Sequence, residues 1–291
     1  MTTVAGALDS RSVARRRARR RLTARPLSVL GAAGAAIAIV VALLAPLISP
    51  HDPAATNFAA VLAPPFHGGH LLGTDQLGRD MLSRMFYGAR ASLEAGVLAT
   101  VLGTVVAVPI GLVAGYYGRW VDTVISRIVD VVLSFPFLII AVGLAAALGP
   151  SLSNAILALG IAQVPNVVRV VRAEVMAQRD LEYVQAETVN GTPTRVVLFR
   201  HILPNVLNPI VVQASVAIPT AIVGAAILSF LGLGVQPPTA AWGNMLSQAQ
   251  TYLSQAPWLG VFPGVAIFLT TLSFNLLGDG VRDALDPRML P

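Results

Sequence analysis

Six apolar stretches dominate the pattern of hydrophobic and polar positions along the chain. They lie at about residues 27–48, 91–115, 128–148, 152–171, 209–233 and 258–278. Each is long enough to cross the hydrocarbon core of a bilayer, which takes about 20 apolar residues in a helix. Composition agrees, because 55% of the residues are hydrophobic and only 12% are charged. We therefore predict an all-α integral membrane protein with six transmembrane helices, the first of which is retained as an anchor.

The positive charge is unevenly distributed. All 20 basic residues are Arg, and eight of them precede the first stretch, in residues 1–26. If the N-terminus is inside, 17 Arg fall in cytoplasmic segments, and the other three, Arg79, Arg84 and Arg90, fall outside. Cytoplasmic segments retain positive charge, so residues 1–26 and 279–291 are predicted to be cytoplasmic tails. An Arg block beside a first span contacts anionic lipid headgroups, and the pattern favours membrane lipid over nucleic acid as its partner.

Two connections are longer than a simple turn. The extracytoplasmic one, residues 49–90, has a first half rich in Pro, His and Gly and ends in an amphipathic run at 81–87. Residues 91–278 form a predicted five-helix core that contains the second long connection.

That second connection, residues 172–208, is cytoplasmic in this topology and carries helix signals of its own. Asp180 is predicted to cap a first helix, which Gly191 ends. Thr192-Pro193 is predicted to start a second helix, which ends or kinks at Pro204. We therefore expect two short helices hinged at Gly191.

This connection also carries a recognisable motif. It reads Tyr183-Val184-Gln185-Ala186-Glu187, then Gly191, then Ile202-Leu203-Pro204. The string resembles the coupling loop of bacterial ABC importer permeases, where Glu-Ala-Ala, Gly and Ile-x-Leu-Pro recur at this spacing. Further segments resemble the second, C-type permease of dipeptide, oligopeptide and nickel importers; they are 72–80, 84–90, 230–243 and 275–288.

The resemblance implies partners and roles. In that family the loop seats in a cleft of a separate ATPase, and a second permease and an extracytoplasmic substrate-binding protein complete the importer. The ATPase-coupling residues carried over are Tyr183, Gln185, Ala186, Glu187, Gly191, Ile202, Leu203 and Pro204. This chain departs from the pattern because Gln185 stands where Glu is usual and Glu187 where the second Ala is usual. On a helix, two residues move the carboxylate by about 200°, to the other face.

Nothing in the sequence indicates catalysis. A P-loop needs a Lys to reach the nucleotide phosphates, and this chain has none. ATP and Mg²⁺ are therefore expected on partner subunits, with no cofactor in this chain. The pair His67 and His70 flanks two Gly residues and is expected to be solvated, so no metal site is predicted.

Polar residues within the spans indicate a transport path. Gln163 and Asn166 flank Pro165, and Asn154 and Gln213 are further candidates for its lining. Such groups are costly in lipid and should face the bundle or a wet cavity. No acidic and basic pair stands mid-membrane to hold a peptide terminus, which favours a weakly selective conduit fed by a binding protein.

The sequence thus predicts a permease subunit of an ABC importer for oligopeptides or dipeptides in the bacterial cytoplasmic membrane. Import of nickel, glutathione or another small solute stays open. From another class, a membrane scaffold or sensor without transport also stays open.

Overall fold

The computed structural model describes residues 26–285. The predicted lipid contacts of the Arg-rich tail, and the last six residues, lie outside the described part. The described residues form helices and no named strand, which confirms the predicted all-α fold. Five helices are long and apolar enough to cross a membrane, or six if one bent pair counts as a single span. They are α2 (Pro26–Ile48), α3 (Met81–Tyr117), α6 (Leu152–Arg179), the continuous helix Thr194–Phe230 that contains α9 (Leu203–Phe230), and α11 (Trp258–Leu285). The bent pair is α4 (Arg119–Leu133) and α5 (Phe137–Leu148).

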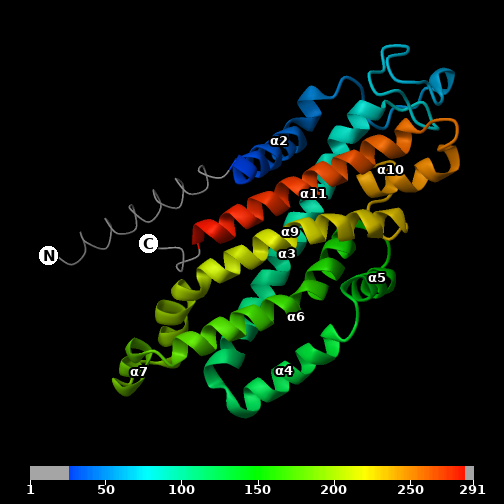
Figure 1. Ribbon diagram of the computed structural model, residues 1–291. Coiled ribbons are helices and arrows are strands. Elements are labelled where there is room, and N and C mark those ends of the chain that lie inside the picture. The colour runs from blue at the N-terminus through cyan, green and yellow to red at the C-terminus, as the bar shows by residue number, and fades with distance from the viewer. Residues whose placement is uncertain (1–25, 286–291) are drawn as a thin grey trace.

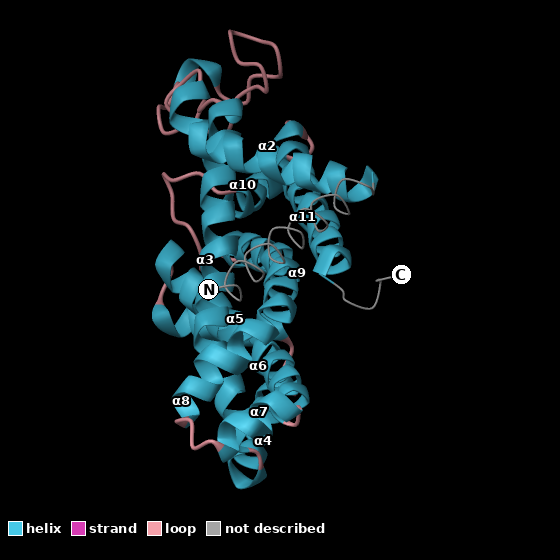
Figure 2. Ribbon diagram, turned by 90° about the vertical axis from the view of Figure 1, so that its left-hand side faces the viewer, coloured by secondary structure: helices cyan, strands magenta, loops and turns pink. Residues whose placement is uncertain are grey.

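The helices form an elongated bundle with two distinct ends. The short helix α7 (Glu182–Val189) lies at one end, and the connection between α2 and α3 lies at the other, beside α10 (Trp242–Ala249) (Figure 1). The start of α2 and the end of α11 both point toward the α7 end. A view from the side shows the same separation, with the loop between α2 and α3 above and α4, α7 and α8 (Thr194–Val196) below (Figure 2).

Helices α3 and α6 form the centre of the bundle because glycines let their backbones approach closely. A Cβ atom added at Gly103 of α3 would lie 2.8 Å from the carbonyl oxygen of Gly160 in α6. At Gly111 it would lie 2.6 Å from Cβ of Val171. Small residues at such crossings are the usual means of packing helices in membranes. The same device joins α2 to α11, where a Cβ at Gly31 would lie 2.6 Å from Cβ of Leu276.

The third predicted span is not one straight helix. The structure divides it into α4 and α5, which are bent by 87° at the intervening residues. Pro136 precedes α5 with an extended ψ of 135°. Proline lacks a backbone N–H and disfavours helical geometry in the residue before it, so the helix stops at this point.

The second predicted span begins ten residues earlier than expected. The amphipathic run at 81–87 is the first part of α3, a single helix of 37 residues. Asp80 caps it, because its Oδ2 accepts a hydrogen bond of 2.8 Å from the backbone N–H of Ser83. A side-chain cap of this kind satisfies one of the free N–H groups at a helix start.

The expectation for the Gly-rich loop is wrong at His70. Its side chain is not solvated but buried, and its Nδ1 lies 2.8 Å from Oδ1 of Asp80. His67, three residues earlier, is exposed as predicted.

The two predicted cytoplasmic helices also differ from the structure. Asp180 does not cap α7; it ends α6, and its carboxylate pairs with Arg179 at 3.2 Å. The second helix does not end at Pro204. Instead α8 (Thr194–Val196) continues through a π-helical segment, η2 (Val197–Ile202), directly into α9. Pro204 stands in the first turn of α9, directly after the π-helical turn.

Candidate functional site

Helix α7 is attached to the bundle by a single buried side chain. Only Val184 of α7 is buried. It belongs to an apolar cluster with Val175 of α6 and with Val197 and Ile202 of η2. The other side chains of α7 are left to make polar contacts or to face outward.

Two hydrogen bonds fix the orientation of α7 between its neighbouring helices. The hydroxyl of Tyr183 donates to Oε1 of Gln178 at 2.7 Å and accepts from Nδ2 of Asn205 at 3.0 Å. Gln178 belongs to α6 and Asn205 to α9, so one side chain joins three helices. Nε2 of Gln185 adds a bond of 3.1 Å to the carbonyl oxygen of Asp180.

Glu187 faces the turn that follows α7. Its Oε2 accepts a hydrogen bond of 2.7 Å from the Thr192 hydroxyl, and its backbone carbonyl accepts from the N–H of Thr192 at 3.1 Å. Between them Gly191 has a φ of +76°, a conformation that side-chain-bearing residues rarely adopt. The Glu187 carboxylate therefore makes a hydrogen bond within the loop. In the family pattern, the Glu stands two residues earlier, where this chain has Gln185.

The structure brings some predicted coupling residues to the surface and buries others. Tyr183, Gln185, Ala186, Gly191 and Pro204 are exposed, while Glu187 and Leu203 are half-buried. Ile202 is fully buried in the cluster around Val184. It supports α7 from beneath and does not itself form surface.

A surface hollow beside the end of η2 extends this face. It is lined by Pro204 together with Arg195, Val196, Phe199 and Arg200. Phe199 is 59% exposed. Sequence reasoning counted the two Arg only as topology signals and did not connect them with Pro204.

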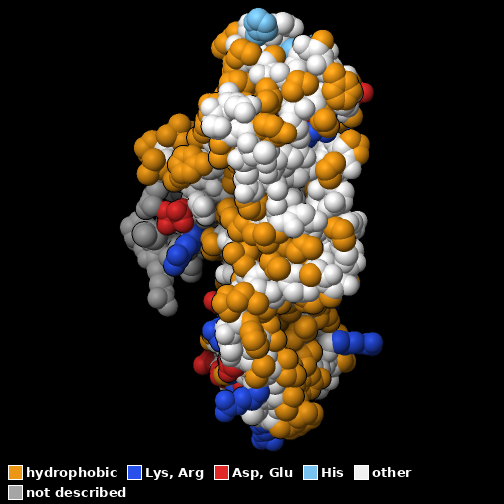
Figure 3. Space-filling model, turned by 90° about the vertical axis from the view of Figure 1, so that its right-hand side faces the viewer, with side chains coloured by type: hydrophobic (Ala, Val, Ile, Leu, Met, Phe, Trp, Pro, Cys, Tyr) orange, Lys and Arg blue, Asp and Glu red, His pale blue; other side chains and the backbone are white. Residues whose placement is uncertain are grey.

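Arginines at the end of α6 hold the surrounding helices together. Nη2 of Arg172 donates to Oδ2 of Asp122 in α4 at 2.6 Å, and Nη1 of Arg179 donates to the carbonyl oxygen of Gly115 in α3 at 2.9 Å. Figure 3 shows charged side chains gathered toward the lower end of the molecule, whereas the middle of the visible face is largely apolar or neutral.

A cavity between α5, α6 and α9 contains three of the four polar residues predicted to line a path. Gln163, Asn166 and Gln213 lie on its wall with Phe137 and Thr220. Gln163 is only 5% exposed, and neither polar atom of its side chain has a hydrogen-bond partner within residues 26–285. A buried, unpaired amide is costly, so this position has an unused capacity for hydrogen bonding.

A second cavity borders the first. Phe137 and Thr220 line both, and the second also contains Thr271 and Asn275 of α11. The break before α5 places Phe137 between them. Nothing in the pattern of the sequence marked Phe137, because its position follows from the bend at Pro136.

Asn154 lies elsewhere. Its Nδ2 donates to the carbonyl oxygens of Leu148 and Gly149, at 2.8 and 2.9 Å. It closes the turn between α5 and α6 and does not line either cavity.

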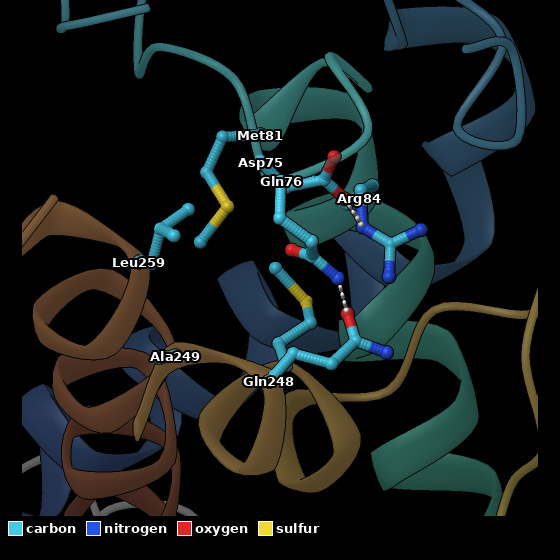
Figure 4. Close-up of a pocket in the computed structure, with 8 residues that line it drawn as sticks. Asp75, Gln76, Met81, Arg84, Gln248, Ala249 and Leu259 are labelled. Carbon is cyan, nitrogen blue, oxygen red and sulfur yellow. Dashed lines mark hydrogen bonds and ion pairs between the residues drawn. The ribbon is translucent and has the colours of Figure 1, made fainter. Parts of the chain in front are cut away.

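At the opposite end, a buried charged cluster fixes the loop before α3 to α10. Oδ2 of Asp75 lies 2.6 Å from Nε of Arg79 and 3.3 Å from Nε of Arg84. Gln76 and Arg79 both donate to Oε1 of Gln248 in α10, at 3.1 and 3.3 Å. Figure 4 shows Asp75, Gln76, Arg84 and Gln248 around a small pocket, which Met81 and Leu259 close on the apolar side.

Comparison with known proteins gives these features a context. Residues 107–291 match the family model described as the binding-protein-dependent transport system inner membrane component. The chain belongs to this family. Residues 14–65 match a second model, the N-terminal transmembrane domain of oligopeptide transport permease C. The resemblance drawn from the coupling motif is thereby confirmed.

Curated relatives of this permease extend along most of its length. It is 44% identical to the dipeptide transport system permease protein DppC of Alkalihalophilus pseudofirmus, covering 94% of this chain and 90% of that protein. The corresponding protein of Haemophilus influenzae is 43% identical, covering 87% and 88%. The glutathione transport system permease protein GsiD of Pectobacterium atrosepticum is 44% identical, covering 76% and 73%.

The fold of the permease also has a solved counterpart. A structure of the methionine ABC transporter MetNI in an inward-facing conformation aligns with a TM-score of 0.56 at 19% identity. The alignment covers 71% of this chain and 98% of that one. By its family match and its relatives, the permease is a multi-pass membrane component of an ABC-type transport system.

Proposed function

We propose that this chain is one permease subunit of an ABC importer that moves dipeptides or oligopeptides into the cytoplasm. The proposal rests on the position of α7. Most of its side chains are exposed, while the Tyr183 hydroxyl joins it by hydrogen bonds to α6 and α9. A partner that moves α7 therefore moves two membrane helices. The relatives from Alkalihalophilus pseudofirmus and Haemophilus influenzae, both dipeptide transport permeases, supply the substrate class.

The partner at α7 is a separate ATP-binding subunit, which binds ATP and Mg²⁺. Tyr183, Gln185 and Ala186 offer it an exposed surface, and the hollow with Arg195, Phe199 and Arg200 offers cationic and aromatic contacts beside it. The absence of Lys from the sequence supports this division of labour, because a P-loop needs one.

The path runs along the two neighbouring cavities and is completed by a second permease. Neither cavity has a charged residue among its described lining. Such a wall can pass peptides of varied sequence because it does not bind their charged ends. Selection of the substrate then falls to an extracytoplasmic binding protein, as the family name implies.

The sidedness follows from the same assignment. If α7 meets a cytoplasmic ATPase, the start of α2 and the end of α11 are cytoplasmic as well, because they point toward the α7 end. Both termini then lie inside, and the 49–80 loop faces the binding protein.

Glutathione is the second candidate substrate. The relative from Pectobacterium atrosepticum is named for glutathione transport and has the same 44% identity as the first dipeptide permease, over 76% of this chain instead of 94%. Glutathione is itself a tripeptide, so it fits the same uncharged path.

The first experiment is co-purification and transport. The chain is expressed with its neighbouring genes, purified, and placed in liposomes with the binding protein. We expect an ATPase and a second permease to co-purify, and dipeptide-loaded binding protein to stimulate ATP hydrolysis several-fold. Glutathione and Ni²⁺ are tested in parallel as substrates. A chain that purifies alone, with no ATPase activity in the preparation, would contradict the proposal and favour a scaffold.

Gly191 gives a sharper test of coupling. Proline cannot adopt a φ of +76° and would lose the hydrogen bond of 3.1 Å from the Gly191 N–H to the carbonyl of Thr188. Gly191→Pro should abolish uptake while the chain still inserts in the membrane. Gly191→Asn is the matched control, since Asn tolerates positive φ, and it should keep most of the activity. Equal uptake by both variants would contradict a role for α7 in coupling ATP hydrolysis to transport.

A further inference from the structure

Three side chains from separate segments converge at the end of the molecule opposite α7. His51 follows the end of α2, His70 stands in the 49–80 loop, and Asp80 caps α3. Oδ1 of Asp80 lies 2.8 Å from Nδ1 of His70 and 3.6 Å from Nδ1 of His51. The two imidazole rings are 4.9 Å apart between centroids. One carboxylate oxygen therefore lies within reach of two imidazole nitrogens.

These distances fit a small divalent cation. Zn²⁺ binds His nitrogen and carboxylate oxygen at about 2.0–2.1 Å in a tetrahedron, which separates ligand atoms by about 3.3 Å. The two separations from Asp80 lie on either side of that value, and the potential ligand atoms of all three residues lie within 4.8 Å of one another. The partly exposed His51 side chain has to move inward to close the set.

The cluster is also built as a site. Asp80 is 2% exposed and His70 is 8% exposed. The second oxygen of Asp80 accepts hydrogen bonds from the N–H and hydroxyl of Ser83, each at 2.8 Å. These bonds fix the carboxylate, as outer hydrogen bonds do for metal ligands. The side chain of His51 is 45% exposed, which leaves an opening for the ion and a place for water as fourth ligand.

We propose that His51, His70 and Asp80 bind one Zn²⁺ or a similar first-row divalent cation. The ligand set of two imidazoles and one carboxylate suits Zn²⁺ better than Mg²⁺ or Ca²⁺, which prefer oxygen. The ion joins the end of α2, the 49–80 loop and the start of α3. It therefore stabilises the loop face on which the importer receives its substrate, a role independent of which solute is carried.

The test is metal binding by the purified full chain. The chain is prepared without a polyhistidine tag, treated with EDTA and titrated with ZnCl₂ against a competing fluorescent chelator. We expect one Zn²⁺ per chain, with MgCl₂ unable to compete. His70→Ala and His51→Ala should each lower the Zn²⁺ affinity more than about 100-fold, because losing a ligand costs more than losing an outer partner.

His67→Ala is the matched control. His67 stands three residues from His70 in the same loop, is exposed, and is outside the cluster. Its replacement should leave the affinity unchanged. If His67→Ala and His70→Ala lower the affinity equally, or if the wild-type chain binds no Zn²⁺, the proposal is overturned.

Stability gives a second readout that does not depend on transport. Zn²⁺ should raise the melting temperature of the wild-type chain and protect the 49–80 loop from proteolysis. Neither effect should appear with His51→Ala, which alters an exposed side chain and leaves the Asp80 cap in place. Protection of both proteins alike would assign the effect to adventitious binding and contradict the proposal.

Discussion

Nδ2 of Asn205, in the first turn of α9, donates a hydrogen bond of 3.0 Å to the hydroxyl of Tyr183 in α7. The same hydroxyl donates to Gln178. The phenolic oxygen thus connects α7 with both of the long helices that flank it. Removing this oxygen breaks the hydrogen bonds but leaves the apolar contact of Val184 in place.

Tyr183→Phe should therefore separate transport from ATP hydrolysis. The lost hydrogen bonds are exposed, so the free energy of unfolding should fall by less than about 1 kcal/mol. Uptake per ATP hydrolysed should fall several-fold in liposomes that contain the whole complex. Tyr117→Phe, at another exposed Tyr at the end of α3, is the control. An equal ratio of uptake to hydrolysis in both variants would contradict a role for this connection.

The close packing of α3 on α6 predicts opposite effects for two Gly→Ala substitutions. Gly103→Ala brings a Cβ to 2.8 Å from a backbone oxygen, and overpacking of this kind costs about 1–3 kcal/mol. Gly143→Ala in α5 meets nothing within 4 Å, and Ala stabilises a helix by about 1 kcal/mol over Gly. Melting curves in one detergent should show a lower midpoint for Gly103→Ala only. Equal shifts would indicate that the two helices are not in direct contact.

The buried cluster of Asp75, Arg79 and Arg84 should contribute strongly to the stability of the chain. The Arg84 side chain is 1% exposed and shares Asp75 with Arg79. Asp75 is the acidic partner of both, so its loss would leave two buried guanidinium groups without a counter-charge, which costs about 3–5 kcal/mol. Asp75→Asn should therefore lower the melting temperature strongly and expose the 49–80 loop to protease. Arg90→Met, at an exposed position of α3, should do neither.

Gln163 and Asn154 should respond differently to the same substitution. Gln163→Leu removes an amide that has no partner within the described chain, so stability should be unchanged or higher while the rate of uptake falls. Asn154→Leu removes two hydrogen bonds that close a turn, so stability should fall by about 1–3 kcal/mol. A fall in stability for Gln163→Leu measured on the isolated chain would mean that its amide is paired within this chain.

The spans could be predicted from the sequence because apolar length is a local property. The first span, expected at 27–48, agrees with α2 at Pro26–Ile48. The bend of 87° at Pro136 could not be foreseen, because proline within a membrane helix kinks it or breaks it depending on the neighbouring helices. The motif around Gly191 was recognisable because it, too, is formed by residues close together in the sequence.

Contacts between distant residues were the part that the sequence did not reveal. His70 and Asp80 are ten residues apart, and the loop that brings them together also depends on Ser83 and His51. In a similar way, Gln163 and Gln213 were chosen singly for their polarity, but the shared wall with Phe137 arises only when α5, α6 and α9 pack. No periodicity along one helix reports such neighbours.

The π-helical segment η2 has a mechanical meaning. Proline in a helix cannot donate to the carbonyl four residues earlier and crowds it; for Pro204 that residue is Arg200, inside η2. The π-helical turn lies where a regular helix would place this crowding, and π turns of this kind are frequent at functional sites. We infer that the Thr194–Phe230 helix bends most easily at η2. The hydrogen bond between Tyr183 and Asn205 acts on α9 beyond that point, so a displacement of α7 can tilt α9 without first bending η2.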